Sequence, residues 1–268
     1  MPNGDLVCVG YDPIEGDSTI EIRDPNNGAV KRTLTDTEYS IYDLVVYDEN
    51  CLISATEDST IKIWNINKEK VERTLKEHID DVKTLVLLNE NELASGSDDE
   101  TIQIWNIKDG TIKASLIGSA NNITSLVLLK NGDLASASDD EDILIWDVDS
   151  ETIKKRLVGH TDGVLKLTVL ENGDLVSGCK DGAIKIWDVE MGTVKRTLTG
   201  HTDYVFALKV LYNGDLVSGS EDRTIKVWNV DDGTVKKDLE LNASVNSLEV
   251  LPNGDLVSAS DRSVIIWE

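Results

Sequence analysis

Serine, histidine and aspartate recur together along this chain, and these residue types can form the catalytic triad of a hydrolase. Three sets stand out: His78, Ser95 and Asp99; His160, Ser177 and Asp181; His201, Ser218 and Asp222. A triad enzyme needs one solvent-accessible serine beside an oxyanion hole, because that serine attacks the substrate. Here the same set of residues occurs several times along the chain, whereas an enzyme needs it once. The chain also has no G-x-S-x-G motif. The pattern therefore favours a structural role for the histidines and predicts no catalytic residue.

Two runs of acidic residues could hold a hard cation such as Ca²⁺, which prefers carboxylate oxygens. They are Asp98–Glu100 and Asp139–Asp142. However, Asp99 and Asp140 occupy positions expected for turn residues, and the chain has no D-x-D-x-D-G loop. The sequence therefore predicts neither a metal site nor a cofactor.

The composition describes a strongly acidic protein. The chain has 268 residues, of which 50 are acidic and 26 basic, with a net charge of −24. Nucleic acid is a poor partner for this charge, because its phosphates must be met by lysine and arginine. A basic protein or peptide fits the sign better. An acidic surface that only favours solubility is the alternative interpretation.

The cysteines and the N-terminus favour an intracellular setting, cytoplasmic or nuclear. Cys8, Cys51 and Cys179 are odd in number and show no C-x-x-C spacing, so neither a zinc site nor a disulfide framework is expected. Reduced thiols are typical of proteins inside the cell. The segment MPNGDLVCVG lacks the features of a signal peptide. No apolar stretch approaches the roughly 18 residues of a membrane span, so no membrane is expected as a partner.

A tryptophan recurs along the chain at a nearly constant interval. Five of them are spaced 41 residues apart, and a sixth follows after 39: Trp64, Trp105, Trp146, Trp187, Trp228 and Trp267. Counting 41 residues back from Trp64 reaches Arg23, whose segment STIEIRD matches the segment STIKIWN around Trp64. The chain therefore contains seven repeats, the first with arginine in place of tryptophan.

Each repeat has the pattern of four short antiparallel strands. In the sixth repeat, YVFALKVL at 204–211 ends in an NGD turn, and the short strand LVSGS follows. TIKVWNV then alternates apolar and polar residues like a half-buried strand, and DDG separates it from TVKKDL. Such a unit cannot bury both faces of its sheet alone, whereas radial stacking of several units buries them. We therefore predict one all-β domain over residues 1–268, a seven-bladed propeller.

These features resemble the WD40 family over essentially the whole chain. That family's repeat carries Gly-His before the first strand, Ser or Thr in the second, Asp in the next turn and Trp-Asp closing the third. Gly159–His160 and Trp187–Asp188 match this pattern in one repeat, and Gly200–His201 matches it in the next. The resemblance implies a hydrogen-bonded chain of His, Ser, Asp and Trp in each complete repeat. Its members would be His78, Ser95, Asp99, Trp105, His160, Ser177, Asp181, Trp187, His201, Ser218, Asp222 and Trp228.

Three repeats depart from this pattern at the histidine. They carry Thr37, Ser119 and Leu241 at that position. A buried polar network stabilises a fold when every member is satisfied, and these repeats lack one member. We expect them to depend more on apolar packing and to be looser.

The two ends of the chain supply incomplete blades. The expected strands are the second, third and fourth of the first blade (5–9, 19–23 and 29–34) and the first, second and third of the last (245–250, 256–259 and 263–267). The first blade thus lacks its first strand, which is the inner one, and the last blade lacks its fourth strand, which is the outer one. Two explanations remain open: a chain cut from a longer repeat array, or a ring closed across two three-stranded blades. Unpaired strand edges could also support self-association.

The expected binding surface is the top face, formed by the loops between blades and the turns between second and third strands. Interface hot spots favour aromatic residues, and several aromatic residues flank the entries to first strands. The residue before each turn aspartate is mostly acidic. The candidates are Tyr39, Tyr42, Asp98, Asp139, Lys180, Tyr204, Phe206 and Glu221. The insertion YDPIEG at 11–16 adds to this face, and packing between blades is the alternative role for the aromatic residues.

Together these features predict a non-catalytic scaffold for protein–protein interaction, with an acidic, aromatic-dotted top face for a basic peptide or protein. One alternative is a structural or engineered repeat array without a dedicated partner. Another is a propeller enzyme, which would need one asymmetric cluster of polar residues in the central channel around which the blades are arranged. The residues at the rim differ between repeats, and this difference favours a binding surface.

Overall fold

The computed structural model describes residues 1, 4–11, 18–35, 39–260 and 263–267. These residues form 26 strands in seven antiparallel sheets. The all-β prediction is therefore confirmed. Among the described residues there is no helix with the length and apolar character needed to cross a membrane. The chain divides into two compact units, Met1–Ile123 and Thr124–Glu268. Thr37 and the YDPIEG insertion after residue 11 lie outside the described residues.

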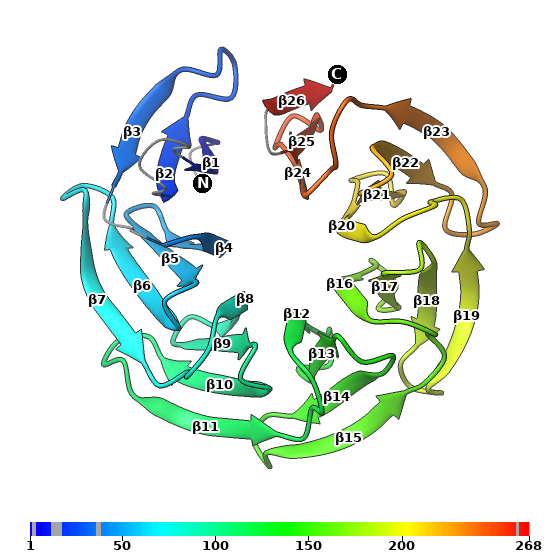
Figure 1. Cartoon of the computed structure of the whole chain (residues 1–268), viewed down its shortest axis with the longest axis horizontal. Helices are drawn as coiled ribbons and strands as arrows, with labels where there is room; N and C mark the ends of the chain where they lie inside the picture. Colours follow the sequence, from blue (N-terminus) through cyan, green and yellow to red (C-terminus); the bar gives the residue numbers. More distant parts are fainter. Residues whose placement is uncertain (2–3, 12–17, 36–38, 261–262, 268) are drawn as a thin grey trace. The chain divides into compact units, whose positions relative to one another are not determined.

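The first unit contains a three-stranded sheet and two four-stranded sheets, drawn in blue to green in Figure 1. The three-stranded sheet comprises β1 (Leu6–Tyr11), β2 (Ser18–Arg23) and β3 (Val30–Leu34). The second sheet comprises β4 (Ile41–Asp48), β5 (Cys51–Thr56), β6 (Thr60–Asn65) and β7 (Lys70–Lys76). The third comprises β8 (Val82–Asn89), β9 (Glu92–Ser97), β10 (Thr101–Asn106) and β11 (Ile112–Ile117). Strands that follow one another in the sequence pair within each sheet, and β4 packs beside β8.

The second unit contains three four-stranded sheets and a final three-stranded sheet. They comprise β12 (Ile123–Leu128), β13 (Leu134–Ser138), β14 (Ile143–Asp147) and β15 (Thr152–Leu157); β16 (Val164–Val169), β17 (Leu175–Cys179), β18 (Ile184–Asp188) and β19 (Thr193–Leu198); β20 (Val205–Val210), β21 (Leu216–Ser220), β22 (Thr224–Trp228) and β23 (Val235–Glu240); and β24 (Ser247–Val250), β25 (Leu256–Ser260) and β26 (Ser263–Trp267). Here β16 packs beside β20, and β20 beside β24. The prediction of three strands in the first and last sheets is confirmed.

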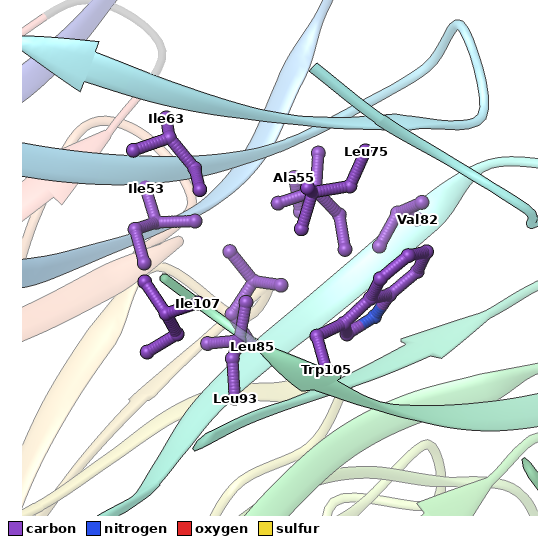
Figure 2. Close-up of a cluster of buried hydrophobic side chains, with 10 residues drawn as sticks. Ile53, Ala55, Ile63, Leu75, Val82, Leu85, Leu93, Trp105 and Ile107 are labelled. Atoms are coloured by element: carbon purple, nitrogen blue, oxygen red, sulfur yellow. The ribbon is translucent and has the colours of Figure 1, made fainter. Parts of the chain in front are cut away.

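Apolar side chains that point into the space between neighbouring sheets form the core. Figure 2 shows one such layer in the first unit, where Trp105 lies beside Val82, and Leu85 and Leu93 lie near Ile107. Trp105 is only 2% exposed. Removing an aromatic side chain of this size from a core typically costs about 3–5 kcal/mol. Five tryptophans of the ladder are large core residues, and Trp267 is half-buried.

A β-bulge accompanies the ladder. The register between the third and fourth strands shifts at the residue pair that ends in the tryptophan in five sheets: Ile63/Trp64, Ile104/Trp105, Ile145/Trp146, Ile186/Trp187 and Val227/Trp228. The same shift occurs at Ile22/Arg23 in the first sheet. A bulge bends its strand and re-aims the side chain. Here the tryptophan reaches back to the second strand of its own sheet.

Candidate functional site

A tryptophan–serine hydrogen bond is shared by the last six sheets. In each, the indole Nε1 donates to a buried serine Oγ at 2.7–2.9 Å. The acceptors are Ser54, Ser95, Ser136, Ser177, Ser218 and Ser258. In the first sheet, Arg23 instead donates to the Glu21 carboxylate and to the Gly28 carbonyl oxygen. In three of these sheets the same serine Oγ also contacts a histidine: His78, His160 or His201.

The third repeat carries the complete network. His78 bonds Ser95 Oγ through Nε2 and Asp99 Oδ2 through Nδ1, both at 2.7 Å. Thr101 Oγ1 donates to Asp99 Oδ1 at 2.7 Å. Burial by itself raises the pKa of Asp99, but the hydrogen bonds from His78 and Thr101 outweigh it and hold the pKa below its usual range. Every member of this buried network is satisfied.

The sixth repeat reproduces the same arrangement. His201 bonds Ser218 Oγ at 2.6 Å and Asp222 Oδ2 at 2.8 Å, and both side chains are almost fully buried. Thr224 Oγ1 donates to Asp222 Oδ1 at 2.7 Å. Burial lowers the pKa of His201, and the Asp222 carboxylate offsets this only in part. Burial alone raises the pKa of Asp222, yet the bonds from Thr224 and His201 leave it lowered.

The fifth repeat breaks the network that the family pattern predicts. His160 Nε2 lies 2.5 Å from Ser177 Oγ, but Nδ1 has no hydrogen-bond partner in the described part of the chain. Asp181 is not bonded to the histidine. Its Oδ2 accepts from Thr161 Oγ1 at 3.0 Å, and its Oδ1 accepts from the Ala183 N–H at 2.9 Å. The expected His160–Asp181 bond is therefore missing.

Two residues around this carboxylate differ from the sixth repeat. Cys179 stands where the sixth repeat has Ser220, and its Sγ donates to the Asp162 carbonyl oxygen at 3.3 Å as Ser220 Oγ donates to the Asp203 carbonyl oxygen at 3.0 Å. Ala183 stands where that repeat has Thr224, so the hydroxyl that orients the aspartate is absent. Burial lowers the pKa of His160 to about 4, and the charge of Lys185 adds to this effect. Burial also raises the pKa of the Cys179 thiol to about 12.

The network serines are poorly placed for nucleophilic attack. Ser95, Ser177 and Ser218 are each 0% exposed, and each accepts an indole hydrogen bond. A triad serine must reach the substrate carbonyl. None of the three serines is therefore positioned for that attack in this geometry.

In the first unit, a tyrosine joins a small group of charges. Tyr42 Oη donates to Asp81 Oδ2 at 2.9 Å, and Lys83 Nζ lies 3.5 Å from the centre of the Tyr42 ring. Lys83 also pairs with Asp81 at 2.7 Å and with Asp98 at 3.3 Å. Tyr39 and Tyr42 are both exposed. The candidate residues Tyr42 and Asp98 are thus connected through Lys83, which sequence reasoning did not include.

In the second unit, an aromatic pair lies near a basic residue. Tyr204 and Phe206 stack edge to face with ring centroids 5.9 Å apart; Tyr204 is exposed and Phe206 is half-buried. The Glu221 N–H donates to the Tyr204 carbonyl oxygen at 2.9 Å, which places these two candidates together. Lys180 pairs with Asp139 at 2.8 Å. Hydrogen bonding to Asp139 raises the pKa of Lys180, and Tyr204 contributes to the same shift.

An acidic pocket adjoins Lys180 in the second unit. Its volume is about 320 Å³. It is lined by Asp139, Asp140, Glu141, Asp142, Thr161, Asp162 and Gly163. The Lys180 N–H donates to the Gly163 carbonyl oxygen at 3.0 Å, so the pocket, Lys180 and Tyr204 lie next to one another. The sequence showed the acidic run, but not that the loop before β16 completes a pocket with it.

The repeats match a known family directly. The profile described as "WD domain, G-beta repeat" (WD40) matches residues 28–65, 69–106, 110–147, 151–188, 192–229 and 233–268. The chain belongs to the WD40 family. It is also similar to a crystal structure of the WD40 β-propeller domain of Doa1, with 25% sequence identity and a TM-score of 0.82. That match covers 98% of this chain and 88% of the other. No curated protein matches this sequence.

Membership of the WD40 family settles the fold class and indicates what such proteins generally do. The seven sheets are the blades of a seven-bladed β-propeller, as predicted. WD40 propellers are generally scaffolds for protein interaction and are typically not enzymes. The functional question for this WD40 chain is therefore which surface binds, and what chemistry that surface recognises.

Proposed function

We propose that this WD40 chain is a non-catalytic scaffold that binds a basic peptide or protein segment through the acidic pocket and the Tyr204–Phe206 pair. The observation that carries the proposal is the pocket of about 320 Å³, which adjoins Lys180 and through it Tyr204 of that pair. A cavity of this size accommodates a lysine or arginine side chain together with neighbouring backbone. The overall net charge of −24 agrees with a basic partner.

The charge balance inside the pocket favours a cation. Five carboxylates line it, whereas two basic side chains pair with them: Lys180 with Asp139, and Arg156 with Asp142, each at 2.8 Å. Glu141 and Asp162 are both exposed. An arginine or lysine from a partner would therefore gain charge-assisted hydrogen bonds in the pocket.

The aromatic pair would supply the anchor for the rest of the segment. Exposed tyrosine next to a half-buried phenylalanine offers a rigid surface that loses little side-chain entropy on binding. An arginine can also stack on the Tyr204 ring. Charges at the rim would mainly speed association and select the sign of the partner.

Fluorescence anisotropy with three labelled peptides of equal length, rich in arginine, lysine or glutamate, tests this function. We expect the basic peptides to bind and the acidic peptide not to bind, with weaker binding at higher salt. The double variant Glu141→Gln/Asp162→Asn should weaken binding by about tenfold, which corresponds to about 1.4 kcal/mol. Tyr204→Ala should have an effect of similar size.

Matched controls lie in the same unit. Glu171→Gln/Glu190→Gln removes two charges from the exposed turns that follow β16 and β18, and Tyr212→Ala removes an exposed tyrosine that lies just after β20. Both controls should bind like the parent chain. Equal losses in control and test variants would show that only net charge or aromatic content matters, and would reject this site.

A further inference from the structure

Three metal-binding side chains converge in the fifth repeat. One ligand atom each from His160, Cys179 and Asp181 lies within 4.8 Å of the other two. His160 and Cys179 are buried, whereas Asp181 is exposed. The three residues come from the loop before β16, the end of β17 and the turn before β18. The group is thus reachable from solvent on one side only.

His160 offers a nitrogen that nothing in the described part of the protein uses. The side chain is 3% exposed, and Nδ1 is the one buried side-chain nitrogen or oxygen without a hydrogen-bond partner there. Nε2 is held 2.5 Å from Ser177 Oγ, which in turn accepts from Trp187. With its proton on Nε2, the ring presents a bare lone pair at Nδ1. A hydrogen bond to the other ring nitrogen is the usual way to fix a metal-binding histidine.

The two complete repeats show that this arrangement is particular to the fifth. There the histidine Nδ1 is already bonded to Asp99 or Asp222. The position of Cys179 is a serine in both, Ser97 and Ser220. Neither complete repeat has a thiol near its histidine. One of the two residue differences around the broken network therefore also supplies a sulfur ligand.

We propose that His160 Nδ1, Cys179 Sγ and an Asp181 carboxylate oxygen bind one Zn²⁺ ion. Zn²⁺ takes nitrogen, sulfur and oxygen ligands in a tetrahedron, with water completing a three-ligand site. Calcium and magnesium prefer all-oxygen sites and would not select a thiol. The thiol proton would leave to solvent as the zinc–sulfur bond forms.

Binding requires a small rearrangement. Ligands of one tetrahedral zinc lie about 3.5 Å apart, so atoms that lie within 4.8 Å of one another must close by at most about 1.3 Å. Asp181 is the exposed member, and its Oδ2 would exchange the hydrogen bond from Thr161 for the metal. Lys185 opposes a cation at this site, while Asp181 and the neighbouring Asp162 favour it. Cys179 Sγ would likewise give up its hydrogen bond to the Asp162 carbonyl oxygen when its proton leaves.

Titration of chelator-treated protein with ZnCl2 tests the site, with competition by a chromophoric chelator as readout. We expect one Zn²⁺ per chain with a Kd of about 10 µM or tighter. Titration with CoCl2 should give the near-ultraviolet absorption of a thiolate–cobalt bond. Cys179→Ser should abolish that absorption and weaken Zn²⁺ binding at least about 100-fold. Because Ser220 occupies the same position in the sixth repeat, this variant is expected to fold.

Cys51→Ser is the matched control, since Cys51 is a half-buried free thiol in β5. It should bind Zn²⁺ and Co²⁺ like the parent chain, and excess CaCl2 should displace neither ion. Absence of Zn²⁺ binding would overturn the proposal. So would binding that Cys179→Ser leaves unchanged or that CaCl2 displaces, because the ion would then be held by surface carboxylates.

Discussion

The fifth and sixth repeats differ in how they complete the same buried polar group. Both keep the indole–serine bond and the serine–histidine bond. In the sixth repeat Asp222 closes the chain on His201, whereas in the fifth Asp181 does not reach His160. At the position of Ser220 the fifth repeat has the thiol of Cys179. At the position of Thr224 it has Ala183, which carries no hydroxyl. Small changes around the carboxylate thus decide whether the histidine is satisfied.

The comparison teaches that the aspartate is a conditional member of the network. In the sixth repeat, Asp222 accepts four hydrogen bonds, from Thr202, Thr224 and His201. Ser220 additionally holds its backbone N–H. A buried polar network is stabilising when all of it is satisfied and costly when it is not. The fifth repeat therefore has a weaker structural network and a histidine nitrogen free for another ligand.

The largest expected effect comes from removing the aspartate in each repeat. Asp222→Ala should lower the free energy of unfolding by about 3 kcal/mol, because it leaves buried His201 unpaired. Asp181→Ala should cost only about 1 kcal/mol, since His160 has no bond to lose and only the turn contacts with Thr161 and Ala183 disappear. Urea unfolding at pH 7 in a chelating buffer measures both values. Equal losses would mean that Asp181 supports His160 in solution, contrary to this geometry.

The sequence was sufficient for the fold but not for this difference. The spacing of the tryptophans and the turn residues between them predicted seven sheets with three strands at each end, and both predictions are confirmed. The bulges at five of the tryptophans were not predicted, because register depends on pairing between strands rather than on local pattern. The periodic burial of side chains follows from residue type along the chain, so it can be predicted from a single sequence.

The polar contacts were harder to predict for a physical reason. The pattern His160, Ser177, Asp181 is intact in the sequence, yet the carboxylate direction depends on neighbours that the pattern leaves open. Cys179 and Ala183 were the available signal, since both differ from the equivalent residues of the complete repeats. The bond between Tyr42 and Asp81 joins residues 39 apart in the sequence. Such contacts follow from the packing of neighbouring sheets, which a repeat pattern does not specify.

The second effect in size is a loss of stability in mild acid that His160 causes. Its pKa is about 4 in the folded chain, below the value of 6.5 for a free histidine. Between these values the unfolded chain binds a proton that the folded chain does not, so stability falls as the pH falls. From pH 7 to pH 5 this loss amounts to about 2 kcal/mol for one histidine.

Two measurements separate this effect from that of other groups. The chain has three histidines, so their ring signals can be followed individually by NMR in a chelating buffer. The His160 signal should titrate near pH 4, and the urea midpoint of His160→Gln should fall less between pH 7 and pH 5 than that of the parent. A His160 signal that titrates near 6.5 would contradict the buried, unpaired environment.

The smallest expected effect is a gain from rebuilding the network in the fifth repeat. Cys179→Ser with Ala183→Thr restores the two hydroxyls that position Asp222 in the sixth repeat. Asp181 should then bond His160, and the free energy of unfolding should rise by about 1 kcal/mol, the net worth of one buried hydrogen bond. The matched single variants should each give less, because both hydroxyls are needed to orient one carboxylate. If the gains of the two single variants add up to that of the double variant, the two hydroxyls act independently. That result would contradict the idea that both orient the Asp181 carboxylate.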